Sequence, residues 1–133
     1  MTFLDTNVIL RYLTWDDSEK AKKVEGLFKR IAKGEESLYT TILVINEVMW
    51  ALEKSYKLPK SEIIDYTKHI LNTPNLHLED KELLLEAINL YELENIDFID
   101  AYNAIFMETK GINSIYSYDK HFDQISAIKR IEP

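Results

Sequence analysis

The chain begins Met1-Thr2-Phe3-Leu4-Asp5-Thr6-Asn7-Val8-Ile9, where a short apolar run meets an acid and then a helical pattern. Thr2–Leu4 predicts a short buried strand that ends at Asp5. The apolar residues beyond the acid have helical spacing, at positions Val8, Ile9, Tyr12 and Leu13. A helix is therefore predicted directly after the strand, which is the repeating unit of α/β folds.

The same alternation continues along the chain. Further short strands are predicted at 37–40, 76–78, 114–118 and 128–131. Helices are predicted from Asp16 or Asp17 to near Gly34, over 41–56, from Ser61 to before Pro74, from Asp80 through Tyr91, and from Asp97 to Gly111. Strands that alternate with helices indicate a parallel sheet with helices on both faces, whose sites lie at the carboxyl ends of the strands.

Length and composition favour one ordinary globular domain spanning 1–133. The chain has 133 residues, and domains average roughly 150. It has no cysteine, which excludes disulfide scaffolds, thiolate metal sites and cysteine nucleophiles. No apolar run approaches the ~18 residues of a membrane span, and the N-terminus lacks the basic start of a signal peptide. We therefore expect a cytoplasmic protein that does not engage a membrane.

Charge is unevenly distributed around a net value of −7. The stretch Lys20–Lys33 holds six basic residues and one acid, whereas Leu76–Glu108 holds nine acids and one base. The basic stretch is either a solvated helix face or a track for phosphates. An acidic protein binds nucleic acid poorly unless its acids are neutralised locally, and a bound divalent metal ion would do that.

Two acids follow predicted strands, where a parallel sheet gathers its functional groups. Asp5 ends the first strand, and Thr6 and Asn7 add polar groups beside it. Asp119 follows the predicted strand near 114–118. The alternatives are structural: Asp5 would cap the next helix, and Asp119 would belong to a turn.

Two further acids stand on predicted helices. Glu47 has only apolar residues one turn away on either side, which predicts a carboxylate on an apolar face that needs a cation, a shifted pKa or a paired base. Asp97 and Asp100 share one face at the start of a helix, where Asp97 could act as the cap. Convergence of these acids above the sheet would require a cation, and oxygen ligands favour Mg²⁺ or Mn²⁺.

Four short motifs occur in order along almost the whole chain: Phe3-Leu4-Asp5-Thr6-Asn7, Asn46-Glu47, Asp97-Phe98-Ile99-Asp100-Ala101 and Ser117-Tyr118-Asp119. Together they resemble the four motifs of PIN-domain ribonucleases. The size and single-domain form look most like the VapC toxins of type II toxin–antitoxin pairs. Ser117 stands where that family usually has Thr, which keeps the hydroxyl.

The resemblance implies a three-layer α/β/α sandwich with a central, mostly parallel sheet of four to five strands. It also implies that one or two Mg²⁺ or Mn²⁺ ions are bound by Asp5, Glu47, Asp100 and Asp119, with Asp5 as the central ligand. Auxiliary roles through hydrogen bonds or charge are implied for Thr6, Asn7, Asp97 and Ser117.

The activity implied is metal-dependent hydrolysis of phosphodiester bonds in single-stranded or looped RNA, by a homodimer silenced by a cognate antitoxin. A basic antitoxin segment would suit the acidic stretch Leu76–Glu108. Two alternatives stay open, a PIN-fold binding module with vestigial cleavage and a housekeeping nuclease that is not a toxin. His121 lies close to Asp119 in sequence and could reach a phosphate, whereas Asp123 matches no ligand of the family.

Overall fold

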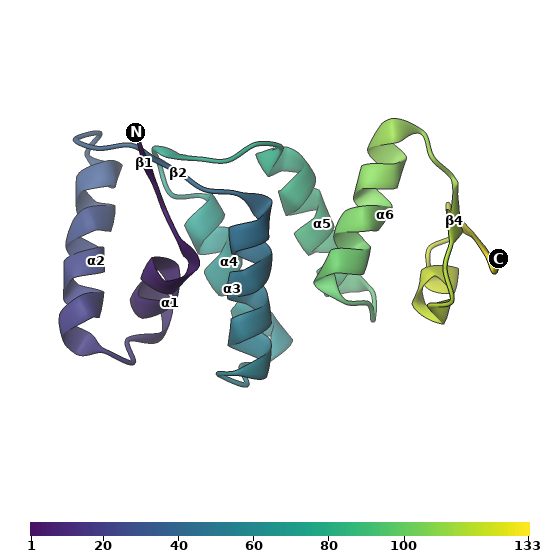
Figure 1. Ribbon diagram of the computed structural model, residues 1–133, viewed down its shortest axis with the longest axis horizontal. Coiled ribbons are helices and arrows are strands. Elements are labelled where there is room, and N and C mark those ends of the chain that lie inside the picture. Colours follow the sequence, from purple (N-terminus) through teal and green to yellow (C-terminus); the bar gives the residue numbers. More distant parts are fainter. The chain divides into compact units, whose positions relative to one another are not determined.

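The computed structural model describes residues 1–133, which form two compact units (Figure 1). The N-terminal unit is Met1–Glu79 and the C-terminal unit is Asp80–Pro133. None of the helices combines the length and the apolar character that a bilayer-spanning helix requires.

The N-terminal unit contains a three-stranded parallel sheet in the order β1-β2-β3. Its strands are β1 (Thr2–Phe3), β2 (Leu38–Tyr39) and β3 (Leu76–His77). The register places Phe3, Tyr39 and His77 in one row across the sheet. Because the strands are parallel, β1 delivers Asp5 to the sheet edge at which all three strands end.

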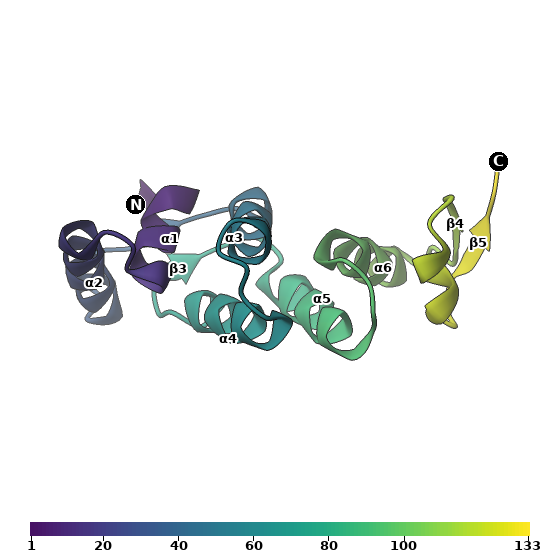
Figure 2. The ribbon, with the colours of Figure 1, turned by 90° about the horizontal axis from the view of Figure 1, so that it is seen from below.

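Four helices surround these short strands (Figures 1 and 2). They are α1 (Thr6–Thr14), α2 (Ser18–Ala32), α3 (Ile42–Lys54) and α4 (Lys60–Leu71). All four were predicted from periodicity. Asp17, not Asp16, caps α2 by accepting a hydrogen bond from the Lys20 amide. Helix α4 begins one residue before Ser61, because Pro59 takes the cap position.

A continuous apolar core holds this unit together. Its most deeply buried large side chains come from the helices and from β2: Ile9, Ile31, Leu38, Ile45, Leu52, Ile63, Ile70 and Leu71. Thr40 is fully buried among them, and its Oγ1 donates a hydrogen bond of 2.9 Å to the carbonyl of Leu4. This bond ties the end of β2 to the residue that precedes Asp5.

The C-terminal unit combines a helix pair with a small sheet. Helices α5 (Lys81–Leu93) and α6 (Phe98–Lys110) pack against each other. Gly111 ends α6 as predicted, with the positive φ of 71° that glycine adopts without strain. Strands β4 (Ser114–Tyr116) and β5 (Lys129–Ile131) pair in parallel, and the 3₁₀ helix η1 (Lys120–Gln124) connects them.

The five predicted strands are all present and every pairing is parallel. They are hydrogen-bonded as a three-stranded and a two-stranded sheet, whereas the family resemblance implies one central sheet of four to five strands. An apolar run identifies a strand but does not identify its neighbour, because pairing depends on contacts remote in sequence. The short η1 was not predicted, since its five residues carry no apolar period.

Candidate functional site

Asp100 and Asp119 form a carboxyl pair in the C-terminal unit. Asp100 lies in the first turn of α6, and Asp119 precedes η1 after the end of β4. Their carboxyl groups lie within hydrogen-bonding reach of each other. Partial burial, then the hydrogen bond to Asp119 and its charge, raise the pKa of Asp100 to about 6.

The partner carboxyl group keeps its negative charge. The backbone N–H of His121 is the main reason that the pKa of Asp119 lies below its ordinary value. Asp100 is therefore the group of the pair that takes up a proton first, as the pH falls below about 6, and its O–H can then donate to the Asp119 carboxylate. A divalent cation can bind between two carboxyl groups this close, and it competes there with the proton.

The turn around Asp119 holds its carboxylate by local hydrogen bonds. The Asp119 amide donates to Ser117 Oγ at 3.0 Å, and Asp119 Oδ1 accepts from the His121 amide at 2.9 Å. The His121 ring nitrogen Nδ1 lies 2.8 Å from the same oxygen. Asp119 therefore has the turn role considered as its structural alternative, and it contacts Asp100 as well.

Asp97 occupies the cap position of α6, but its side chain makes no capping hydrogen bond. Its negative charge instead contributes to the raised pKa of Asp100. The capping role considered for the Asp97 side chain is therefore wrong. Its negative charge acts on Asp100 instead, by raising the pKa of that group.

Asp5 connects β1 to α1 and is exposed. It occupies the cap position of α1 without accepting a capping hydrogen bond, so the structural alternative considered for it is wrong. The adjacent Thr6 is only 3% exposed, and its Oγ1 has no hydrogen-bond partner. Asn7 is exposed on the first turn of α1. Asp5 is thus an exposed carboxylate without a capping hydrogen bond, and the neighbouring Thr6 hydroxyl has no hydrogen-bond partner.

Glu47 stands among apolar neighbours as expected, but it is not buried, so burial does not require a cation or a paired base. Glu47 is exposed on α3, between Leu43 and Trp50, which are 74% and 58% exposed. The buried side of α3 consists of Val44, Ile45, Val48, Met49 and Leu52. Glu47 also makes no ion pair, so the alternative of pairing with a lysine or arginine is not observed. Apolar spacing along one helix does not distinguish a buried face from an exposed apolar one.

The four predicted ligands are divided between the units: Asp5 and Glu47 in the first, Asp100 and Asp119 in the second. No group of three or more histidine or acidic side chains is gathered closely enough to hold a metal ion. The donor chemistry nevertheless fits Mg²⁺ or Mn²⁺, because carboxylate oxygens are their usual protein ligands and the Asp100–Asp119 pair already brings two together.

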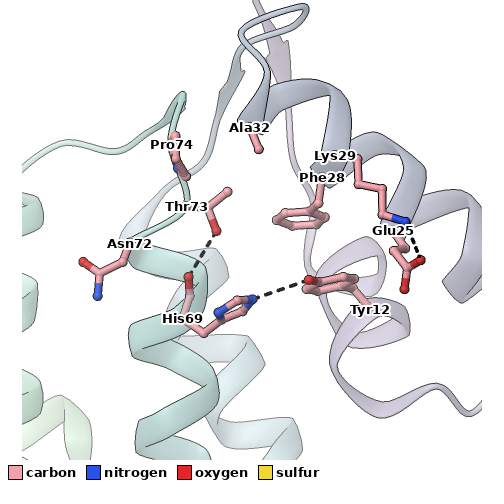
Figure 3. A pocket seen from close by; sticks show the side chains of 9 residues that line it. All are labelled: Tyr12, Glu25, Phe28, Lys29, Ala32, His69, Asn72, Thr73 and Pro74. Atoms are coloured by element: carbon pink, nitrogen blue, oxygen red, sulfur yellow. Dashed lines mark hydrogen bonds and ion pairs between the residues drawn. The ribbon is translucent and has the colours of Figure 1, made fainter.

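A separate cavity of about 420 Å³ lies in the N-terminal unit between α1, α2 and the end of α4 (Figure 3). The Tyr12 ring stacks on Phe28 with centroids 4.4 Å apart, and Tyr12 Oη lies 3.4 Å from Nε2 of His69. Lys29 and Glu25 form an ion pair at its edge. None of the predicted site residues lines this cavity.

Comparison with known proteins extends over the whole chain. The model of the PIN domain family matches residues 2–128. A VapC ribonuclease of Aquifex aeolicus (strain VF5) is 29% identical over 133 residues, covering 100% of this chain and 97% of the relative.

Two solved structures are similar to this chain over almost its full length. One is Mycobacterium tuberculosis VapC20, a toxin that cleaves the sarcin–ricin loop (17% identity, TM-score 0.41, 100% of both chains covered). The other is VapBC2 of Rickettsia felis bound to a DNA fragment from its promoter (14% identity, TM-score 0.39, 98% of this chain and 97% of that chain). Because the family model matches almost every residue, the chain belongs to the PIN domain family.

Proposed function

We propose that this protein is a Mg²⁺- or Mn²⁺-dependent endoribonuclease that hydrolyses phosphodiester bonds in single-stranded or looped RNA. The observation that carries this proposal is the close Asp100–Asp119 carboxyl pair in a chain of the PIN domain family. The full-length similarity to a VapC ribonuclease supports the same reaction.

Asp5, Glu47, Asp100 and Asp119 are the proposed metal ligands. When bound, a divalent ion supplies positive charge that polarises the phosphate and lowers the pKa of an attacking water. Below about pH 6 Asp100 must release a proton to act as a ligand, whereas Asp119 ionises at lower pH and is held by Ser117 and His121. Asp5 and Glu47 make no capping hydrogen bond or ion pair that would have to break before they bind a metal ion.

Thr6, Asn7, Asp97 and Ser117 are proposed as supporting residues. Ser117 orients the turn that carries Asp119 through a hydrogen bond. Asp97 acts through its charge on Asp100. The unsatisfied hydroxyl of Thr6 beside Asp5 is suited to a hydrogen bond with a ligand or with a phosphate oxygen.

We also propose that the protein is the toxin of a toxin–antitoxin pair, active in the cytoplasm as a homodimer. The similarity to a VapC ribonuclease supports this role. The acidic stretch Leu76–Glu108 supports contact with a basic antitoxin segment, since it contains nine acids and only one base. Co-purification of a basic protein encoded beside this gene, with light scattering of the free and bound forms, tests these partners.

The test of the activity is cleavage of a mixed, structured RNA by purified protein with Mg²⁺, with Mn²⁺ and with EDTA. Asp5→Asn and Glu47→Gln should remove cleavage while the protein stays folded. Matched controls are Asp65→Asn and Glu62→Gln, exposed acids of α4 outside the proposed site. These should cleave like the parent protein.

Two outcomes would count against this function. A folded parent protein that cuts no RNA with either metal would favour the binding-module alternative. Cleavage that survives both Asp5→Asn and EDTA would show that the activity comes from another nuclease.

A further inference from the structure

Arg130 of β5 makes four side-chain hydrogen bonds in the C-terminal unit, although neither the sequence motifs nor the proposed site includes it. Its side chain is only 13% exposed. Nη1 donates to the backbone carbonyl of Ser117 at 3.0 Å and to Glu132 Oε1 at 2.9 Å. Nε and Nη2 donate to Asp123 Oδ1 and Oδ2 at 3.0 and 3.4 Å, a bidentate pairing.

The residues that Arg130 contacts lie on both sides of Asp119 in the sequence. Ser117 comes directly after β4 and before Asp119, and Asp123 comes after Asp119, within η1. One guanidinium group thus holds both ends of the segment 117–123. Between the ends, Asp119 accepts from the His121 amide, and the buried ring of Phe122 anchors η1.

We propose that Arg130 is a positioning residue for Asp119, acting together with Asp123 through the segment 117–123. The inference rests on the proposed function, in which Asp119 is a metal ligand. Ligating carboxylates must be held within about 0.5 Å of their working position, and hydrogen bonds from surrounding residues supply that constraint. Asp123, which matches no ligand position, acquires a role as the anchor for Arg130.

Arginine is suited to this task for a geometric reason. Its planar group presents several N–H donors in fixed directions, so that it can grip a carboxylate with two bonds and a carbonyl with a third. A lysine ammonium carries the same charge but cannot make this set of contacts. Replacement of Arg130 by lysine therefore separates positioning from charge.

The variants Arg130→Lys, Arg130→Met and Asp123→Asn test the proposal. Asp123 and Glu132 are 55% and 54% exposed, so loss of the guanidinium leaves no buried unpaired acid and the fold should persist. The control is Arg30→Met, which removes a surface arginine paired with Glu36 in the N-terminal unit. If Arg130→Met fails to fold, Asp123→Asn still removes the bidentate grip.

Three measurements are combined. Calorimetric titration of the RNA-free protein with Mn²⁺ should show roughly tenfold weaker binding in all three variants. The NMR amide signals of residues 117–121 should shift and broaden. With RNA, kcat should fall roughly 10- to 100-fold while KM changes little, because RNA binding does not depend on the carboxylate position. The combined variant Arg130→Met/Asp123→Asn should lose no more than either alone.

Parental Mn²⁺ affinity together with unmoved amide signals in folded Arg130→Met would overturn the proposal. Effects in Arg130→Met that Arg130→Lys restores fully would also overturn it, because charge alone would then suffice. A parent protein that cuts no RNA contradicts the proposed function instead. The amide signals and the Mn²⁺ titration would still decide the role of Arg130 in that case.

Discussion

The Asp100 and Asp119 carboxyl groups lie within hydrogen-bonding reach of each other, and Asp100 is the one that takes up a proton first. This contact joins the first turn of α6 to the turn after β4, and it brings two acidic groups close together. The arrangement raises the pKa of Asp100 to about 6, with burial as the main cause. Below about pH 6 a divalent cation that enters here must displace a proton, which links metal binding to pH.

Asp100→Asn should stabilise the metal-free protein at pH 7. A raised pKa in the folded state means that the contribution of Asp100 to stability is complete below its unfolded pKa of ~3.9 and is lost as the pH rises through about 6. Asn avoids that loss. Solvent screens the half-exposed pair, so we expect about 1 kcal/mol and a Tm increase of roughly 4 °C.

Thermal unfolding at pH 7 and pH 4 provides the measurement. Most of the stabilisation should disappear at pH 4, where Asp100 is protonated in the folded state and about half protonated in the unfolded chain. Asp65→Asn, on the exposed side of α4, should leave Tm unchanged at both values. A lower Tm for Asp100→Asn at pH 7 would show that the carboxyl group stabilises the fold.

Metal affinity should decline as the pH falls below about 6, because Asp100 then retains its proton. Mn²⁺ titration calorimetry in two buffers of different ionisation enthalpy should detect the proton released on binding. His121→Ala is the informative control, since the imidazole contacts Asp119 Oδ1. Disappearance of the pH dependence in His121→Ala would assign it to histidine instead.

Thr40→Val should destabilise the protein by about 1–3 kcal/mol. It removes the buried hydroxyl that donates to the Leu4 carbonyl at 2.9 Å. Thr67→Val is the matched comparison, since Thr67 is 2% exposed and bonds the Ile63 carbonyl in its own helix. Because that carbonyl keeps its helical hydrogen bond, Thr67→Val should cost under about 1 kcal/mol. Equal costs in urea unfolding would contradict a special role for the Thr40 bond.

A single domain spanning 1–133 predicts one cooperative unfolding transition. Both tryptophans, Trp15 and Trp50, belong to the N-terminal unit, so their fluorescence follows that unit alone. Far-UV circular dichroism follows the helices of both units. The two midpoints in urea should coincide. A second transition seen only by circular dichroism would show that the two units unfold independently.

Local pattern was a good guide to the secondary structure. The apolar spacing after Asp5 predicts α1, and Gly111 marks the end of α6, because helix periodicity and termination depend on neighbours within a few residues. The same local logic located Asp5 and Asp119 at strand ends. It failed for η1 and for the partner expected at Glu47, because the apolar face around Glu47 is exposed.

The alternation of strands and helices, the acids at their ends and the family of the chain follow from the order of residues alone. The closeness of Asp100 to Asp119, the absent cap hydrogen bond of Asp5 and the contacts of Arg130 around Asp119 depend on the folded arrangement. Spacing along the chain specifies the face on which a residue stands. Its partner is specified by packing between segments remote in sequence, where burial and hydrogen bonding change the pKa of a carboxyl group.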